Sequence, residues 1–336
     1  MDICKTNSIS SKYFLIFESN GGSVIEKICI DDKSTLHLLN TPRKNGSFFA
    51  GWFIDNGTFE IRFNEYYLFN NPITSDITIY AKWIILPEGL SCEKIDDDVI
   101  IISYSGTETE LILPSGITSI GEYAFVDADF LHSIMIPNTV IRIGEGAFKW
   151  SNIRHVKFQE ESKLMIIESD AFEYAIKLTS IDIPKGVKSI GTCAFRGAEN
   201  LKSIVIPEGI TSIETSMLNG ASSLASIIIP NSVIRIEDYA FLEASNLKTV
   251  IFKEGSQLTS IGDSAFKGNT NLTSIVIPNG VKSIGNYAFE NAISLTEFRI
   301  PSSVTDLGIA AFAGAKSLIS VFIPQNIKSI QSTFRF

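Results

Sequence analysis

The strongest constraint on the fold is a unit of about 23 residues that recurs along most of the chain. Each copy follows the pattern L-x-S-I-x-I-P-x-x-V-x-x-I-G-x-x-A-F, as in residues 272–289. The spacing stretches to 24 and 25 residues where residues 159–163 and 253–257 replace the usual proline turn. Met217-Leu218 replaces one Ala-Phe pair, and the phenylalanine of this pair otherwise recurs at Phe125, Phe148, Phe172, Phe195, Phe241, Phe266, Phe289 and Phe312.

The unit predicts a stack of short strands rather than helices. Its I-x-I alternation is typical of a strand, and the proline that follows ends the strand because proline cannot donate a backbone hydrogen bond. One unit cannot bury its apolar residues alone, so neighbouring units must stack into a solenoid. We expect the phenylalanines to form a continuous internal spine. The residues expected to point into one coil are Ile204, Ile206, Ile210, Ile213 and Leu218.

The unit resembles the BspA-like, Treponema-type leucine-rich repeat, because I-P, I-G and A-F recur together in phase from about residue 111 to 336. The predicted fold is therefore mainly β: a leucine-rich-repeat solenoid of about ten units. Members of this family are typically surface or secreted proteins that bind host proteins, matrix or other cells, and the resemblance implies such a role. The chain departs from the pattern where a glutamate replaces the glycine, at Glu168, Glu214 and Glu237.

A different segment, residues 12–84, precedes the repeats. Its landmarks are residues 13–17 before a Ser-Asn-Gly-Gly-Ser turn, residues 42–53 ending in Gly-Trp-Phe, and residues 77–83 ending in Lys-Trp. In that order they resemble the Listeria–Bacteroides repeat, a small β-grasp module common in bacterial surface proteins. We interpret Trp52 and Trp83 as core anchors, residues 1–11 as a tail, and residues 85–110 as a linker that caps the first repeat.

Composition and motifs argue against catalysis and against several partner classes. The net charge of −9 disfavours nucleic acid and anionic membranes. No metal-ligand or redox spacing joins the four cysteines. His132 and His155 lie in neighbouring repeats at different strand positions, near Lys157 and Arg154, where no carboxylate or thiol partner for a metal is expected. Residues 96–98, three adjacent aspartates, are interpreted as a solvated turn. We therefore predict no enzyme activity, no cofactor, no metal site and no membrane insertion.

The repeat predicts one exposed face, because the middle residue of I-x-I must point away from the core. Stacking places these residues in a first row: Met135, Lys157, Asp182, Val205, Ile228, Ile251, Val276, Arg299 and Phe322. A second row on the same face includes Ser203, Ser226, Thr249 and Ser274.

The β-branched stretch from Val205 to Val276 has two readings. It reflects either the β propensity of an outward strand position or an apolar binding stripe. Under the second reading, charged residues at both ends of the row form a rim.

These features predict a non-enzymatic protein-binding protein that acts in adhesion or host interaction through the solenoid's strand face. Its expected ligand is a protein, such as a host matrix or cell-surface protein. The alternative is an intracellular or structural interaction scaffold. The resemblances favour the cell surface, whereas the N-terminal residues show no recognisable signal peptide and so favour the cytoplasm. No oligomeric state is predicted.

Overall fold

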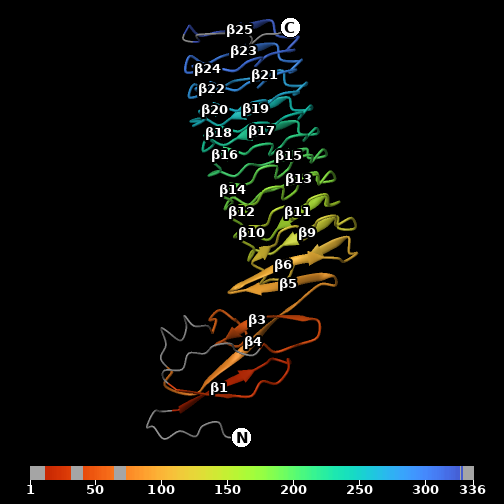
Figure 1. The fold of residues 1–336 in the computed structure, drawn as a ribbon, viewed down its shortest axis with the longest axis vertical. Coiled ribbons are helices and arrows are strands. Elements are labelled where there is room, and N and C mark those ends of the chain that lie inside the picture. The colour runs from red at the N-terminus through yellow and green to blue at the C-terminus, as the bar shows by residue number, and fades with distance from the viewer. Residues whose placement is uncertain (1–11, 32–40, 64–72, 326, 328–336) are drawn as a thin grey trace. The chain divides into compact units, whose positions relative to one another are not determined.

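The computed structural model describes residues 12–31, 41–63, 73–325 and 327 (Figure 1). It divides the chain into two compact units, Met1–Pro87 and Glu88–Phe336. The division falls inside the stretch predicted as linker and cap. The predicted tail at residues 1–11 lies outside the described residues.

The first unit contains a four-stranded mixed sheet in the order β2-β1-β4-β3. Its strands are β1 (Lys12–Glu18), β2 (Ile28–Asp31), β3 (Ser47–Phe53) and β4 (Ile77–Ile85). Strands β1 and β4 run parallel, and the other pairs are antiparallel. Trp52 is buried in the core against Phe17, with ring centroids 5.1 Å apart. Trp83 is half-buried, and its indole N–H donates to the Ser19 carbonyl at 2.8 Å, so both tryptophans anchor the sheet as expected.

The second unit is an all-β solenoid of about ten coils, which confirms the predicted fold class. Each coil contributes one main strand, in the L-x-S-I-x-I part of the repeat, to one side of the solenoid. The main strands are β7 (Glu110–Ile112), β9 (Ser133–Ile136), β11 (His155–Phe158), β13 (Ser180–Ile181), β15 (Ser203–Ile204), β17 (Ser226–Ile229), β19 (Thr249–Phe252), β21 (Ser274–Ile275), β23 (Glu297–Arg299) and β25 (Ser320–Phe322).

A second, shorter strand precedes the glycine position of the repeat, and the sequence analysis did not assign it. These strands stack on the other side of the coils (Figure 1). They are β8 (Ser119–Ile120), β10 (Arg142–Ile143), β12 (Ile166–Ile167), β14 (Ser189–Ile190), β16 (Ser212–Ile213), β18 (Arg235–Ile236), β20 (Ser260–Ile261), β22 (Ser283–Ile284) and β24 (Asp306–Leu307).

A hairpin of β5 (Leu90–Ile95) and β6 (Asp98–Tyr104) precedes the first coil. Strand β6 pairs in parallel with β8, so the hairpin takes the place of a preceding coil in the short-strand sheet. Val99 and Ile101 are buried, and the ring of Tyr104 packs 5.4 Å from that of Phe125. The hairpin therefore covers an edge that would otherwise leave backbone groups and apolar surface open.

The core is built from the residues that the repeat predicts. The five inward residues expected for the coil of Leu218 are all buried. The eight phenylalanines are fully buried, and neighbouring rings stack at 4.9–5.3 Å from Phe125 to Phe195 and 5.1–5.5 Å from Phe241 to Phe312. The spine is not continuous, because Leu218 separates these two stacks.

The turn around each phenylalanine depends on two left-handed residues. They lie two positions before and two positions after it, as Tyr123 (φ 53°) and Asp127 (φ 52°) do around Phe125. Glycine fills the second position at Gly197, Gly220, Gly268 and Gly314, because it adopts this conformation without steric cost. The turns are joined by backbone hydrogen bonds, such as that from the Phe148 N–H to the Ala171 carbonyl at 2.7 Å.

Candidate functional site: the strand face of the solenoid

The main strands present the outward row that the sequence predicted. Val205, Ile228, Ile251 and Val276 are 62%, 51%, 48% and 84% exposed, while the residues beside them point inward, as buried Ile227 and Ile229 do around Ile228. Lys157, Asp182, Arg299 and Phe322 are exposed as well, and Met135 is half-buried. We name the four β-branched residues the apolar stripe.

Parallel, in-register pairing brings neighbours of the row together. Lys157 lies opposite Met135, and Ile228 lies opposite Ile251. The exposed hydroxyl row is aligned in the same way, since Ser226 pairs with Thr249 and Thr249 with Ser274. Two neighbouring pairs in the row are exceptions, Val205 with Ile228 and Val276 with Arg299, because β15 and β17, and likewise β21 and β23, belong to different sheets.

A concavity of about 560 Å³ lies at one end of the apolar stripe. Ile251 and Val276 line it together with Thr249 and Pro278. Lys253, in the insertion that lengthens this repeat, also lines it and forms an ion pair with Glu208 two coils away. The insertion is visible in the sequence, but the concavity is not, because its depth depends on how the inserted residues fold back over the strands.

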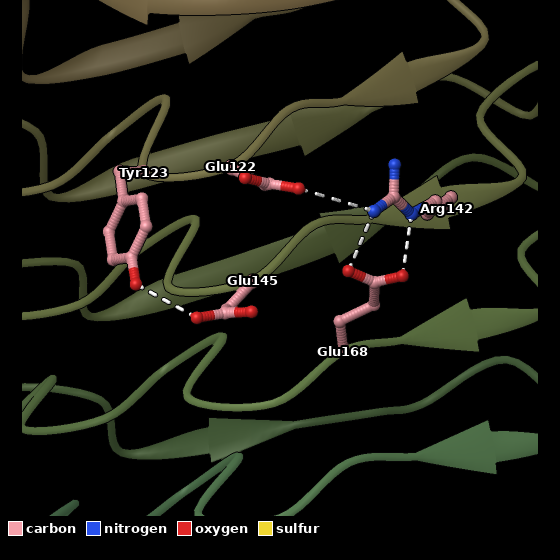
Figure 2. Close-up of polar contacts among 5 residues, drawn as sticks. All are labelled: Glu122, Tyr123, Arg142, Glu145 and Glu168. Carbon is pink, nitrogen blue, oxygen red and sulfur yellow. Dashed lines mark hydrogen bonds and ion pairs between the residues drawn. The ribbon is translucent and has the colours of Figure 1, made fainter.

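Ionisable groups gather on the opposite, short-strand side of the first coils (Figure 2). Arg142 donates two hydrogen bonds of 2.7 Å to the Glu168 carboxylate, and Glu122 lies 3.9 Å from the same guanidinium. The Tyr123 hydroxyl donates to Glu145 at 2.9 Å. Each of these contacts joins side chains of two neighbouring coils, so these polar groups already have partners within the solenoid.

Hydrogen bonds shift the pKa values of Glu168 and Tyr123 on this side. The hydrogen bonds from Arg142 lower the pKa of Glu168, and the bond to Glu145 raises the pKa of the Tyr123 phenol. These hydrogen bonds join neighbouring coils, so this cluster supports the stacking of the solenoid. The cluster also shows why a glutamate can replace glycine at position 168, because the Glu168 carboxylate reaches back to Arg142 of the previous coil.

The thiols are poor nucleophiles. Burial raises the pKa of Cys92 to about 11 and also raises that of Cys193, so little of either is thiolate at neutral pH. Cys193 is half-buried in the left-handed position before Phe195. Residues 96 and 97 form the turn of the β5–β6 hairpin.

Two kinds of site are absent from the described residues. No group of three or more histidine, cysteine, aspartate or glutamate side chains could hold a metal ion there. That part of the chain also has no helix long and apolar enough to span a bilayer.

Comparison with known families identifies both parts of the chain. The family model described as BspA type leucine rich repeat region matches in six copies, over residues 102–173, 165–267 and 255–335. The Listeria-Bacteroides repeat domain matches residues 13–82. A protein of Evansella cellulosilytica that is named as a Gly-rich membrane protein is 31% identical over 84 residues, which is 25% of this chain. The chain spans only 9% of that relative's length.

The chain is also similar to solved structures. A leucine rich cell surface protein from Faecalibacterium prausnitzii is 25% identical, with a TM-score of 0.54 over 72% of this chain and 76% of that one. The pneumococcal vaccine antigen PcpA is 24% identical, with a TM-score of 0.48 over 74% of each chain.

Proposed function

The chain belongs to the BspA-type leucine-rich repeat family, and from this membership we propose that it is a non-enzymatic protein that binds a protein partner through the strand face of its solenoid. The observation that carries the proposal is the exposed apolar stripe of Val205, Ile228, Ile251 and Val276 with a concavity at its end. Contiguous exposed apolar surface on a soluble domain usually marks an interaction site.

The layout of the face fits a protein interface. The stripe would form the desolvated centre, and the concavity beside Ile251 would receive one apolar side chain of the partner. The exposed hydroxyl row supplies hydrogen-bonding groups alongside the stripe. Charged residues at both ends, Lys157 and Arg299, would form the solvated rim that interfaces commonly have.

We place this activity at the cell surface or outside the cell, in adhesion or host interaction. Support comes from the Faecalibacterium neighbour, which is named as a cell surface protein, and from the two surface-associated repeat types in one chain. Protease treatment of intact cells that carry the native gene tests the location. Release of solenoid peptides while a cytosolic marker stays intact supports it, whereas survival of the chain until lysis supports the intracellular scaffold instead.

Site-specific photocrosslinking tests the binding face. A benzophenone amino acid replaces Ile228 in the stripe, and the matched control carries it at Met165, which is exposed near the short strands. We expect one covalent adduct with a partner protein from position 228 and none from position 165. Ile251→Glu should remove that adduct, because a carboxylate buried in an apolar interface costs at least ~1.4 kcal/mol, or about tenfold in affinity.

The purified partner then allows a direct measurement. Ile228→Glu with Ile251→Glu should keep the circular dichroism spectrum of the native protein, since both side chains are exposed, and should lower the urea midpoint only slightly, because the two carboxylates lie opposite each other on paired strands. If that double variant still bound the partner with native affinity, the strand face would not be the site.

A further inference from the structure

Three backbone ladders tie each coil to the next. One joins the main strands, one joins the short strands, and the third joins the turns around the phenylalanines. In most of the solenoid all three are present at once. Between the coils of Phe148 and Phe172, for example, β9 pairs with β11, β10 pairs with β12, and the Phe148 N–H donates to Ala171.

Two of the three ladders are interrupted at the coil of residues 201–223. Strand β14 ends the six-stranded sheet and β16 begins another, so the short-strand ladder stops before this coil. Strand β15 ends its sheet and β17 begins the next, so the main-strand ladder stops after it. The main-strand ladder also stops between β21 and β23, and at both main-strand interruptions the short strands remain paired, β16 with β18 and β22 with β24. The coil of residues 201–223 differs because the short-strand ladder is interrupted on its other side, between β14 and β16.

The turn ladder continues through the same coil. The Phe195 N–H donates to the Met217 carbonyl at 3.0 Å, and the Leu218 N–H donates to the Ala240 carbonyl at 2.8 Å. The turn ladder therefore joins this coil to both of its neighbours. On each side, however, the coil lacks the pairing of one of the two sheets.

Two departures from the repeat coincide at this coil. Leu218 replaces the phenylalanine and divides the ring stack, so the ring-to-ring contacts that join other coils are missing on both sides. Glu214 replaces the glycine of β16's turn. A Cβ built at the equivalent Gly191 would lie 2.4 Å from the Ser169 nitrogen, so a side chain at this position requires the local backbone to shift.

The other two glutamates at this position provide a comparison. Glu168 and Glu237 keep their bonds to the preceding coil, at 3.0 and 2.9 Å between nitrogen and oxygen. Each forms an ion pair with an arginine, Arg142 or Arg235. Glu214 forms no ion pair within the described part of the chain.

We propose that the coil of residues 201–223 is a flexing point of the solenoid, with the continuous turn ladder as its axis. Opening at this point separates β15 from β17 and thereby changes the distance between Val205 and Ile228 in the middle of the apolar stripe. The strand face then adapts its curvature to what it contacts. The inference rests on the backbone pairing and not on the proposed function, so each can fail without the other.

Hydrogen exchange at single-residue resolution tests the proposal on the native, full chain. Two matched amide pairs are available. The Glu237 N–H donates to Ile213 and the Lys248 N–H to Ala225, whereas the equivalent Glu214 and Ala225 amides lie at the two interruptions. We expect Glu214 and Ala225 to exchange at least ~10-fold faster than their counterparts, after correction for intrinsic rates. Equal protection within each pair would overturn the proposal.

Restoring the repeat tests the cause. The variant Met217→Ala, Leu218→Phe, Glu214→Gly returns the coil to the consensus and should slow exchange at Ala225 by about the same factor. The reverse change, Ala265→Met with Phe266→Leu, puts the same pair into a coil whose ladders are intact. It should speed exchange at Lys282, whose amide donates to Thr259 at 2.7 Å. If the first variant left exchange at Ala225 unchanged, these residues would not create the flexing point and the proposal would be wrong.

Discussion

The phenylalanine spine makes a quantitative prediction about Phe172. Its ring is fully buried and stacks on Phe148 at 5.0 Å and on Phe195 at 5.3 Å. Replacing a buried phenylalanine by alanine costs about 3–5 kcal/mol through lost transfer free energy and the cavity left behind. Each stacked aromatic pair adds roughly 0.5–1.5 kcal/mol, and Phe172 has two. We therefore expect Phe172→Ala to lower the free energy of unfolding by about 4–8 kcal/mol.

Phe172→Leu is the matched control. The native chain already carries leucine in this position at Leu218, where it is fully buried, so leucine fits the slot. It keeps most of the apolar volume and loses only the ring contacts, which predicts a cost of about 1–2 kcal/mol.

Urea unfolding followed by far-ultraviolet circular dichroism measures both variants. In a solenoid the effect acts through nearest-neighbour interfaces, so the loss appears as a lower midpoint and as a transition that is split at the altered coil. If Phe172→Ala moved the unfolding free energy by less than about 1 kcal/mol, the spine would not be the main source of stability.

Three further predictions concern single residues. Gly197→Ala should destabilise by about 1–3 kcal/mol in urea, because φ is 67° and the new Cβ would lie 2.3 Å from a tyrosine ring carbon. Gly255→Ala, with φ 75° and open space, should cost only ~1 kcal/mol, and equal losses would contradict the clash. Glu168→Gln should remove roughly 0.5–1 kcal/mol at pH 7. That difference in stability should vanish in acid. Arg142 lowers the pKa of Glu168 in the folded chain below the usual 4.5, so the stability from the ion pair is lost as the pH falls through that pKa. A difference that did not depend on pH would argue against the ion pair. Burial raises the pKa of Cys92 from 9.0 to about 11, which lowers its thiolate fraction at pH 8 by roughly 100-fold, while a thiolate of higher pKa is ~10-fold more nucleophilic. Cys92 should therefore react with iodoacetamide roughly 10-fold more slowly in the folded chain than in urea. Mass analysis of the peptide that carries Cys92 measures this, and equal rates would refute the burial effect.

Much of the fold could be predicted because the repeat encodes it in short-range patterns. The alternation around Ile227, Ile228 and Ile229 is enough to assign two residues to the core and one to the surface, and the structure confirms all three. The outward position of the first row follows from the same alternation. Whether that row binds a partner stays a prediction, because alternation specifies exposure and not recognition.

Other features escaped the sequence. The short strands have only two residues each, so they carry no alternation of their own and exist through pairing with neighbouring coils. The left-handed turn positions hold residues as different as Tyr123, Cys193 and Gly197, so no single residue type marks them. The concavity beside Ile251 depends on the path of an insertion, which the pattern does not specify.

The repeat, the inward and outward residues and the buried phenylalanines could all be read from the amino-acid order alone. The reason is that a periodic set of apolar residues can be buried only if the coils stack on one another. Only the tertiary structure decided which coils are joined on all sides and which are not. A backbone ladder requires two strands at hydrogen-bonding distance and in register, and no local pattern records that this pairing stops on either side of the coil that holds Leu218 and Glu214.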